Sequence, residues 1–445
     1  MFQRNVESQL NVWKNSTNRK PLILRGARQV GKTTLIQEFS KNYLFSIYLN
    51  LERREDKAMF DQFLDLPTLM DALRLKYRIP KESLSKTLLF IDEIQESPRA
   101  IAQLRYFYEE FPSIHVIAAG SLLEFALKDV KSFPVGRVEY LNLHPLNFKE
   151  YLLALNREDL LEELHKTPIN EAAHGLLKSI FHEYALYGGM PEVLKHKVDG
   201  ADIIELSKIY EGLWSTYESD IEKYSQSASE RRIIRHVITT APFYLDQRVT
   251  FEGFGNSNYR SREIGEALRT LNDTKLIRLL YPTTDVSFPI KPNFKRKPRL
   301  QFLDTGLLNF KSGIQGSLLA LDDLSKAYKG ALIPHLITQE LISTHDGTPY
   351  FWVREKVQSS AEVDLIHAHH DRLYPIEVKS GATGTLKSLH EFIDASGQNK
   401  AIRMYAGKWS LQESRTRQGK EFTLLNIPYY LGTTLPLEWL HNKSS

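Results

Sequence analysis

A glycine-bounded loop between an apolar strand and a helix constrains this chain more than any other feature. Residues 22–24 are apolar, and the loop after them has the pattern Gly26-x-x-x-x-Gly31-Lys32-Thr33. Glycines at both ends let such a loop curl with its N–H groups turned inward, where they hold phosphate oxygens at the positive end of the next helix. The pattern therefore predicts a nucleotide-binding loop of nine residues: Gly26, Ala27, Arg28, Gln29, Val30, Gly31, Lys32, Thr33 and Thr34.

An acidic pair supplies the partner that such a loop needs for hydrolysis. Residues 87–91 form an apolar, strand-like run that ends in Asp92 and Glu93, about 60 residues after the loop. We expect Lys32 to contact the β- and γ-phosphates of ATP, and Thr33 and Asp92 to hold Mg²⁺. Glu93 is placed to orient and deprotonate the attacking water. The predicted ligands are therefore ATP and Mg²⁺, and the predicted chemistry is hydrolysis.

Ser121 and Arg137 are further candidates for this site. Ser121 follows an apolar run at 114–120, where its hydroxyl would contact the γ-phosphate or the water; capping of a helix at 122–127 is an equally good explanation. Arg137 precedes another strand-like run, and an arginine there would stabilise charge on the transferred phosphoryl group, within the chain or across a subunit boundary. The second arrangement requires a homo-oligomer. A surface ion pair is the alternative for Arg137.

The composition is that of a globular protein with several domains. A length of 445 residues, with 42% hydrophobic and 25% charged residues, suggests about three domains. The chain contains no cysteine, which excludes disulfides and thiolate metal sites. No apolar run reaches the roughly 20 residues that span a bilayer, and the first residues lack a signal-peptide pattern. We therefore expect a cytoplasmic protein without a membrane partner. The net charge of +4 is too small to indicate nucleic-acid binding by itself.

Several segments resemble a prokaryotic family of AAA-type ATPases of the AAA+ superfamily. They are the run at 136–151, the Gly-Gly-x-Pro-Glu turn at 188–192, the Tyr-x-x-Asp-Ile segment at 217–221 and the Asp-x-Gly-Leu corner at 304–307. In that family, an AAA+ core is joined to a C-terminal domain of uncharacterised function that is related to restriction-endonuclease-like folds. The resemblance implies ATP use and an architecture, but no physiological role.

The implied fold class is α/β, with four parts along the chain. They are a P-loop AAA-type core at 1–150, a helical lid at 151–225, a winged-helix-like domain at 226–310 and a restriction-endonuclease-like α/β domain at 311–445. The apolar spacing at 144–225 agrees with helices.

Residues 226–310 favour contact with nucleic acid, and we expect double-stranded DNA as the partner. Two basic amphipathic helices, at 230–240 and 261–272, precede a hairpin with strands at 275–282 and 299–302. Helices followed by a hairpin are typical of a winged helix, which the resembled family carries here. The candidates for phosphate contact are Arg260, Arg262, Arg269, Lys295, Arg296 and Lys297. A solvated basic loop and a protein-docking module are the alternatives.

Two carboxylates and a lysine form a second constellation near the C-terminus. Glu377 and Lys379 share one face of a strand, and Asp364 lies on a neighbouring strand. Together they offer two ligands for a second Mg²⁺ and a lysine that positions water. This resembles the Asp…Glu-x-Lys core of restriction-endonuclease-like nucleases, and Glu340 in a helix at 332–344 matches the helix carboxylate that some of them use. A charge-paired strand end in a fold without activity is the alternative.

The favoured hypothesis is an ATP-hydrolysing AAA-type switch coupled to a C-terminal half that faces nucleic acid. Mg²⁺-dependent DNA cleavage is left open. The alternative is an ATP-driven signalling or scaffold protein whose winged-helix and nuclease-like domains bind only protein partners.

Overall fold

Two units make up the part of the chain that the structure describes. A computed structural model describes residues 1–63, 65–121, 123, 136–225, 227–245, 247–316, 330–344, 349–354, 361–369, 372–381 and 385–435. The first unit is Met1–His144 with Asp273–Lys275, and the second is Pro145–Asn272 with Leu276–Ser445. None of the described helices combines the length and apolar character needed to cross a bilayer.

The first unit is built on a five-stranded parallel sheet with the order β2-β3-β4-β1-β5. Its strands are β1 (Leu22–Arg25), β2 (Phe45–Asn50), β3 (Thr87–Asp92), β4 (His115–Gly120) and β5 (Glu139–Asn142). Every residue of β3 and β4 is buried, which explains why these segments read as continuous apolar runs. The strands expected from the apolar runs at the places of β1, β3, β4 and β5 are confirmed.

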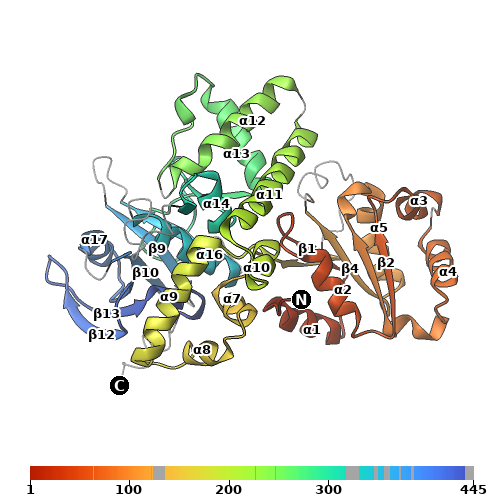
Figure 1. The fold of residues 1–445 in the computed structure, drawn as a ribbon, viewed down its shortest axis with the longest axis horizontal. Coiled ribbons are helices and arrows are strands. Elements are labelled where there is room, and N and C mark those ends of the chain that lie inside the picture. Colours follow the sequence, from red (N-terminus) through yellow and green to blue (C-terminus); the bar gives the residue numbers. More distant parts are fainter. Residues whose placement is uncertain are drawn as a thin grey trace. The chain divides into compact units, whose positions relative to one another are not determined.

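Helices cover both faces of this sheet. They are α1 (Val6–Asn15), α2 (Lys32–Ser40), α3 (Arg54–Gln62), α4 (Leu66–Tyr77) and α5 (Pro98–Glu110), with short 3₁₀ turns at Lys81–Lys86 and Ile94–Glu96. Leu89 and Ile91 of β3 join one apolar core with α3, α4 and α5. The intervening side chains of β3 point to the other face because strand residues alternate. In Figure 1, α3, α4 and α5 lie on one side of the strands and α2 on the other.

The second unit begins with helices and a hairpin. The helices are α7 (Phe148–Ala154), α8 (Glu158–Glu163), α9 (Glu171–Tyr187), α10 (Pro191–Val198), α11 (Ile203–Tyr224), α12 (Ala228–Thr240), α13 (Ser261–Asp273) and α14 (Thr305–Lys311). The strands β6 (Ile277–Leu280) and β7 (Arg299–Phe302) pair antiparallel as a two-stranded sheet. One apolar core contains residues from each of the helices α10, α11, α12, α13 and α14 and from both strands of the hairpin. The expected helices and hairpin are confirmed, whereas the winged-helix identity stays a prediction.

A six-stranded mixed sheet with the order β12-β13-β11-β10-β9-β8 completes the second unit. Its strands are β8 (Tyr350–Val353), β9 (Glu362–His369), β10 (Arg372–Val378), β11 (Lys400–Tyr405), β12 (Ser410–Arg415) and β13 (Glu421–Pro428). The helix α16 (Leu332–Thr344) precedes these strands, and α17 (Lys387–Ala395) lies between β10 and β11. The first three strands form an antiparallel meander. β10 and β11 pair parallel, so the chain needs a crossover, and α17 supplies it (Figure 1).

Segments that carry the family resemblance meet in a buried junction of the second unit. The carboxylate of Asp304 accepts hydrogen bonds from the N–H groups of Gly189 at 2.6 Å and Leu307 at 3.0 Å. A Cβ atom at Gly189 would lie 1.9 Å from the carbonyl oxygen of Leu146, so only glycine fits this approach. The glycine turn, the Asp-x-Gly-Leu corner and the run at 136–151 therefore hold α9, α14 and α7 together.

Candidate functional site

The carboxyl ends of three neighbouring strands meet at one edge of the first sheet. β4 pairs with both β1 and β3, and all three run parallel. The phosphate-binding loop follows β1, the pair Asp92–Glu93 ends β3, and Ser121 follows β4. The fold thus brings together the residues that the sequence predicted for one nucleotide site.

The loop after β1 has the backbone geometry that its glycine pattern predicted. Gly31 has a φ of 94° and stands at the N-cap position of α2, where no side chain accepts a hydrogen bond from the helix. The first N–H groups of α2 have no acceptor within the helix, so they are available to an anion. Lys32 is 7% exposed and donates to the carbonyl oxygens of Gly26 at 3.1 Å and Ala27 at 2.7 Å. Burial lowers the pKa of Lys32 to about 8, although the charges of Glu93 and Asp92 act in the opposite direction.

Thr33 and Asp92 lie side by side. The Thr33 hydroxyl donates to Oδ2 of Asp92 at 2.8 Å, and Tyr48 on β2 donates to the same oxygen at 3.2 Å. Asp92 is 2% exposed, and burial raises its pKa. A hydroxyl and a carboxylate in contact provide two hard oxygen ligands, which is the protein contribution that Mg²⁺ uses beside phosphates and water. The residues present therefore fit magnesium.

Glu93 is held in a strained backbone conformation beside a residue that the sequence did not single out. Its φ of 51° is unusual for a non-glycine residue, and such positions cluster at functional sites. Gln95 donates from Nε2 to Oε2 of Glu93 at 2.5 Å. The same side chain lies over Gly120, where a Cβ atom would be 2.4 Å from its Oε1. Gln95 thus positions the Glu93 carboxylate. In the sequence, only its place two residues after Glu93 could have indicated this role.

Ser121 presents a buried hydroxyl at this edge. The residue is 5% exposed, and its Oγ has no hydrogen-bond partner among the described residues. Buried polar atoms without a partner are uncommon, and they often mark a site for a ligand or water. The alternative role of Ser121 as a helix cap concerns residues 122–127, which lie outside the described residues except for Leu123.

Arg137 lies at the end of the sheet where the parallel strands begin, opposite to the end that carries the phosphate-binding loop. It comes just before β5, and Glu139 of β5 pairs with Leu22 at the start of β1. Its Nε contacts Oε1 of Glu109 at 3.0 Å near the end of α5, and its side chain is 45% exposed. The described chain therefore places Arg137 in a surface ion pair and does not bring it to the phosphate-binding loop.

Asp364, Glu377 and Lys379 come together in the second unit. Val378 donates its N–H to Oδ2 of Asp364 at 2.8 Å, which joins β9 to the end of β10. Lys379 contacts Oε1 of Glu377 at 2.6 Å. Glu377 is 6% exposed, and its Oε2 has no hydrogen-bond partner among the described residues. Burial raises the pKa of both carboxyl groups, and the charge of Asp364 adds to the effect on Glu377.

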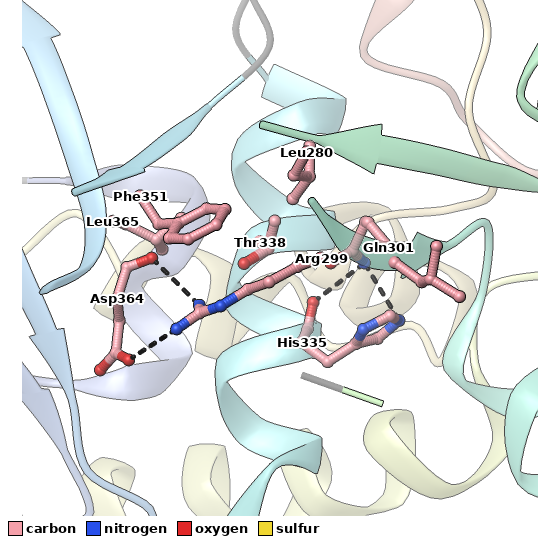
Figure 2. Close-up of a pocket in the computed structure, with 9 residues that line it drawn as sticks. Leu280, Arg299, Gln301, His335, Thr338, Phe351, Asp364 and Leu365 are labelled. Atoms are coloured by element: carbon pink, nitrogen blue, oxygen red, sulfur yellow. Dashed lines mark hydrogen bonds and ion pairs between the residues drawn. The ribbon is translucent and has the colours of Figure 1, made fainter. Parts of the chain in front are cut away.

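Arg299 joins this group from β7, and the sequence did not assign it there. Its guanidinium forms an ion pair with Glu362, lies 3.8 Å from Oδ1 of Asp364 and donates to the Asp364 carbonyl oxygen at 3.5 Å. Figure 2 shows the guanidinium pointing toward Asp364 at the side of a small pocket. The pocket measures about 10 Å³, enough for one water, and is lined by Leu280, Arg299, Leu300, Gln301, His335, Thr338, Phe351, Asp364 and Leu365. In the described part of the chain, no set of three or more histidines and carboxylates is arranged to hold a metal ion.

Glu340 has a different set of partners. It is 1% exposed and accepts hydrogen bonds from Phe148 N–H at 3.1 Å and from the Tyr184 hydroxyl at 2.7 Å. Burial raises its pKa to about 8. Thr338 lines the pocket beside Asp364, and Glu340 is rotated about 200° from it around the helix. The Glu340 side chain therefore contacts α7 and α9 and lies on the side of α16 away from Asp364. The structure does not bring Glu340 to the group of Asp364, Glu377 and Lys379.

The candidates for DNA contact are mostly exposed. Arg260, Arg262 and Arg269 lie exposed at α13, and Arg262 forms a surface pair with Glu266 at 2.9 Å. In the loop between β6 and β7, Lys295 and Lys297 are exposed and Arg296 is half-buried.

An exposed aromatic ring lies among the loop lysines. Phe294 is 72% exposed, and its ring packs edge-on against Tyr281 at a centroid distance of 4.9 Å. Burial raises the pKa of Tyr281, and the charge of Arg269 counteracts part of this rise. The charge of Arg269 on α13 thus acts on Tyr281, which directly follows β6.

Comparisons with known proteins divide the chain into three matched regions. Residues 18–152 match the family model of an AAA domain. Residues 178–318 and 329–430 match two models that are each described as a domain of unknown function (DUF8612 and DUF4143). No curated protein matches the chain significantly.

Solved structures add little to this result. A Drosophila ORC structure bound to AT-rich DNA and Cdc6 matches with 13% identity over 70% of this chain and 90% of that chain, at a TM-score of 0.20. The match of residues 18–152 to an AAA domain and the parallel sheet with its phosphate-binding loop agree with each other.

Proposed function

We propose that this chain is an ATP-hydrolysing AAA-type switch. The observation that carries the proposal is the hydrogen bond of 2.8 Å between Thr33 and Asp92, because it joins the loop after β1 to the end of β3 at a single site. A loop that only turned the chain would not need a carboxylate from a strand two places away in the sheet. The AAA-domain match supports the same function.

The residues at this edge take distinct roles in the proposal. Lys32 and the first amides of α2 hold the phosphates, while Thr33 and Asp92 would hold magnesium, which supplies positive charge against the phosphate oxygens. Glu93 accepts the proton of the attacking water, and Ser121 contacts the γ-phosphate. Arg137 lies at the other edge of the sheet, so a catalytic role for it requires a second copy of the chain that brings it to the nucleotide.

Replacing Lys32 by alanine is expected to weaken ATP binding by about 100-fold or more, because the buried ammonium is the fixed positive charge for the phosphates. Titration with a fluorescent ATP analogue measures the effect. Lys41→Ala is the matched control, since Lys41 lies just after the same helix and pairs with Glu38 at the surface. Equal affinities in wild type and Lys32→Ala would contradict the site.

A second proposal is that the C-terminal half contacts double-stranded DNA through the basic surface formed by Arg269 and the β6–β7 loop. The supporting observation is the exposed loop itself, in which Phe294 stands between Lys291 and Lys295 and no acidic residue occurs from 286 to 299. Lysines contact phosphates, and an exposed aromatic ring provides a face or wedge for bases.

Exchanging Lys295 and Lys297 together for alanine is expected to weaken DNA binding and to reduce the salt dependence of the affinity by about two phosphate contacts. Fluorescence anisotropy with a duplex at several salt concentrations measures both quantities. Lys408→Ala is the control, because Lys408 is an exposed lysine elsewhere in the unit that pairs with Glu171. A flat salt response in wild type would instead favour the alternative, in which this half binds protein partners.

Mg²⁺-dependent DNA cleavage at Asp364, Glu377 and Lys379 is the finer form of the second proposal. It is supported by the meeting of these three side chains at the ends of β9 and β10, and by the buried Oε2 of Glu377 that has no partner among the described residues. Asp364 and Glu377 would hold the metal, and Lys379 would position water.

A further inference from the structure

Arg299 supplies a positive charge to two carboxylates of the C-terminal group. Its side chain is 11% exposed, and the guanidinium reaches both Glu362 and Asp364. These carboxylates lie two residues apart on β9, so they share one face of the strand. The guanidinium also lies over the ring of Phe351, 4.5 Å from its centroid. Arg299 is therefore held from three sides.

Among the described residues, three carboxylates and three cations of this group balance in charge. Each carboxylate has a positively charged partner within the second unit. Arg248 contacts Glu362 at 3.0 Å, Arg299 contacts Glu362 and Asp364, and Lys379 contacts Glu377 at 2.6 Å. A divalent cation that binds Asp364 and Glu377 would meet the positive charge of Arg299 at the same carboxylate. Binding of the metal and retention of this ion pair therefore oppose each other.

We propose that Arg299 is a built-in competitor of the divalent metal, so that the site at Asp364 and Glu377 admits metal only when the guanidinium leaves Asp364. This inference deepens the proposed metal site of the C-terminal half and rests on it. Arginine suits the role because its charge is permanent and its planar fork contacts two carboxylates at once. Arg299 also begins β7, directly after the basic loop, so the competitor belongs to the element that carries the proposed DNA surface.

Manganese binding to the full chain tests the inference. Mn²⁺ is titrated without nucleotide and followed by electron paramagnetic resonance, in wild type and in the variants Arg299→Gln and Arg248→Gln. Arg248 is the matched control because it pairs with the same Glu362, whereas the guanidinium beside Asp364 is that of Arg299. We expect Arg299→Gln to bind Mn²⁺ at least about 10-fold more tightly than wild type, and Arg248→Gln to match wild type. Adding Glu377→Gln to Arg299→Gln should remove the gain.

Two outcomes would overturn the inference. One is equal or weaker Mn²⁺ binding in Arg299→Gln, and the other is the same gain in Arg248→Gln. If thermal melting shows that Arg299→Gln does not fold, Arg299→Lys serves instead. Lysine keeps a charge but loses the fork, so a gain of several-fold is expected, and an unchanged affinity overturns the inference.

Nicking of supercoiled plasmid separates this inference from the nuclease proposal. Tighter Mn²⁺ binding in Arg299→Gln without nicking would reject the nuclease and leave the competitor role standing. Mg²⁺-dependent nicking by Arg299→Gln that Glu377→Gln abolishes would support both. Nicking by wild type at the rate of Arg299→Gln would support the nuclease and reject the competitor.

Discussion

Replacing Glu93 by glutamine is expected to lower ATP turnover by about 10²–10⁴-fold while ATP stays bound. The amide keeps the shape of the side chain but cannot take the proton of the attacking water. The binding groups, Lys32 and the pair Thr33–Asp92, are unchanged in this variant, so affinity should hold. Release of inorganic phosphate, measured beside the affinity for the nucleotide, separates the two effects.

Glu96→Gln is the matched control for this prediction. Glu96 is a half-buried carboxylate in the same short turn as Gln95, and it lacks the contact that Gln95 makes with Glu93. Its exchange should leave turnover within about two-fold of wild type. Unchanged turnover in Glu93→Gln would reject Glu93 as the base, and the loss of turnover in Glu96→Gln alone would move the role to that residue.

The second large effect concerns Glu340, whose exchange for alanine is expected to destabilise the second unit by about 3 kcal/mol. The residue is 1% exposed, and its removal would leave Phe148 N–H without its acceptor. The Tyr184 hydroxyl lies 2.9 Å from the Leu146 carbonyl and 2.7 Å from Glu340, but it has one hydrogen to donate. Protonation of Glu340 would reverse the hydrogen bond between these two side chains, so that Glu340 donates to the Tyr184 oxygen and the Tyr184 hydrogen is left for the Leu146 carbonyl.

The raised pKa of Glu340 fixes the sign of a pH effect. Burial raises the pKa of Glu340 to about 8, although the hydrogen bonds from Tyr184 and Phe148 oppose the rise. The folded state therefore binds more protons than the unfolded state between the ordinary glutamate pKa of about 4.3 and the folded value. This contribution to stability is full below the ordinary pKa and is lost as the pH rises through about 8. Its size is of the order of a few kcal/mol.

Urea unfolding of wild type and Glu340→Gln at several pH values measures this contribution. A glutamine donates to Tyr184 at every pH, so the variant should equal or exceed wild type near pH 8 and lose the Glu340 part of the pH dependence. Asp304 also has a raised pKa, about 6, and stays in both proteins, so their difference isolates Glu340. Glu162→Gln, at an exposed position, should leave the profile unchanged. Parallel profiles for wild type and Glu340→Gln would show that Glu340 is ionised in the fold.

The nucleotide site could be predicted from the sequence because local patterns and sheet topology agree there. The glycine spacing fixes the loop, and the apolar runs before Asp92 and Ser121 indicate buried parallel strands whose carboxyl ends meet at one edge. Arg137 could not be placed in this way. Its position depends on β5 running parallel beside β1, which leaves the residue at the opposite edge.

Sequence patterns could not predict the roles of residues whose side-chain partners come from distant parts of the chain. Gln95 is separated from Glu93 by one residue, but its role depends on the close approach of Gly120. Arg299 and Asp364 are 65 residues apart, and only the packing of the hairpin beside the sheet joins them. Glu340 was assigned to the carboxylate group at the end of β10 because of its helix, whereas helical rotation turns it toward Tyr184. Strand and helix positions follow from periodicity, but partners across a fold do not.

Single-turnover phosphate release by the wild-type chain tests the central claim most directly. Enzyme in excess over labelled ATP and Mg²⁺ is quenched over time, and the fraction of phosphate released is measured beside that of Glu93→Gln. The proposed site predicts complete hydrolysis by wild type and bound, intact ATP in the variant. Wild type that binds ATP and releases no phosphate over hours would contradict a hydrolytic switch and leave a nucleotide-binding scaffold.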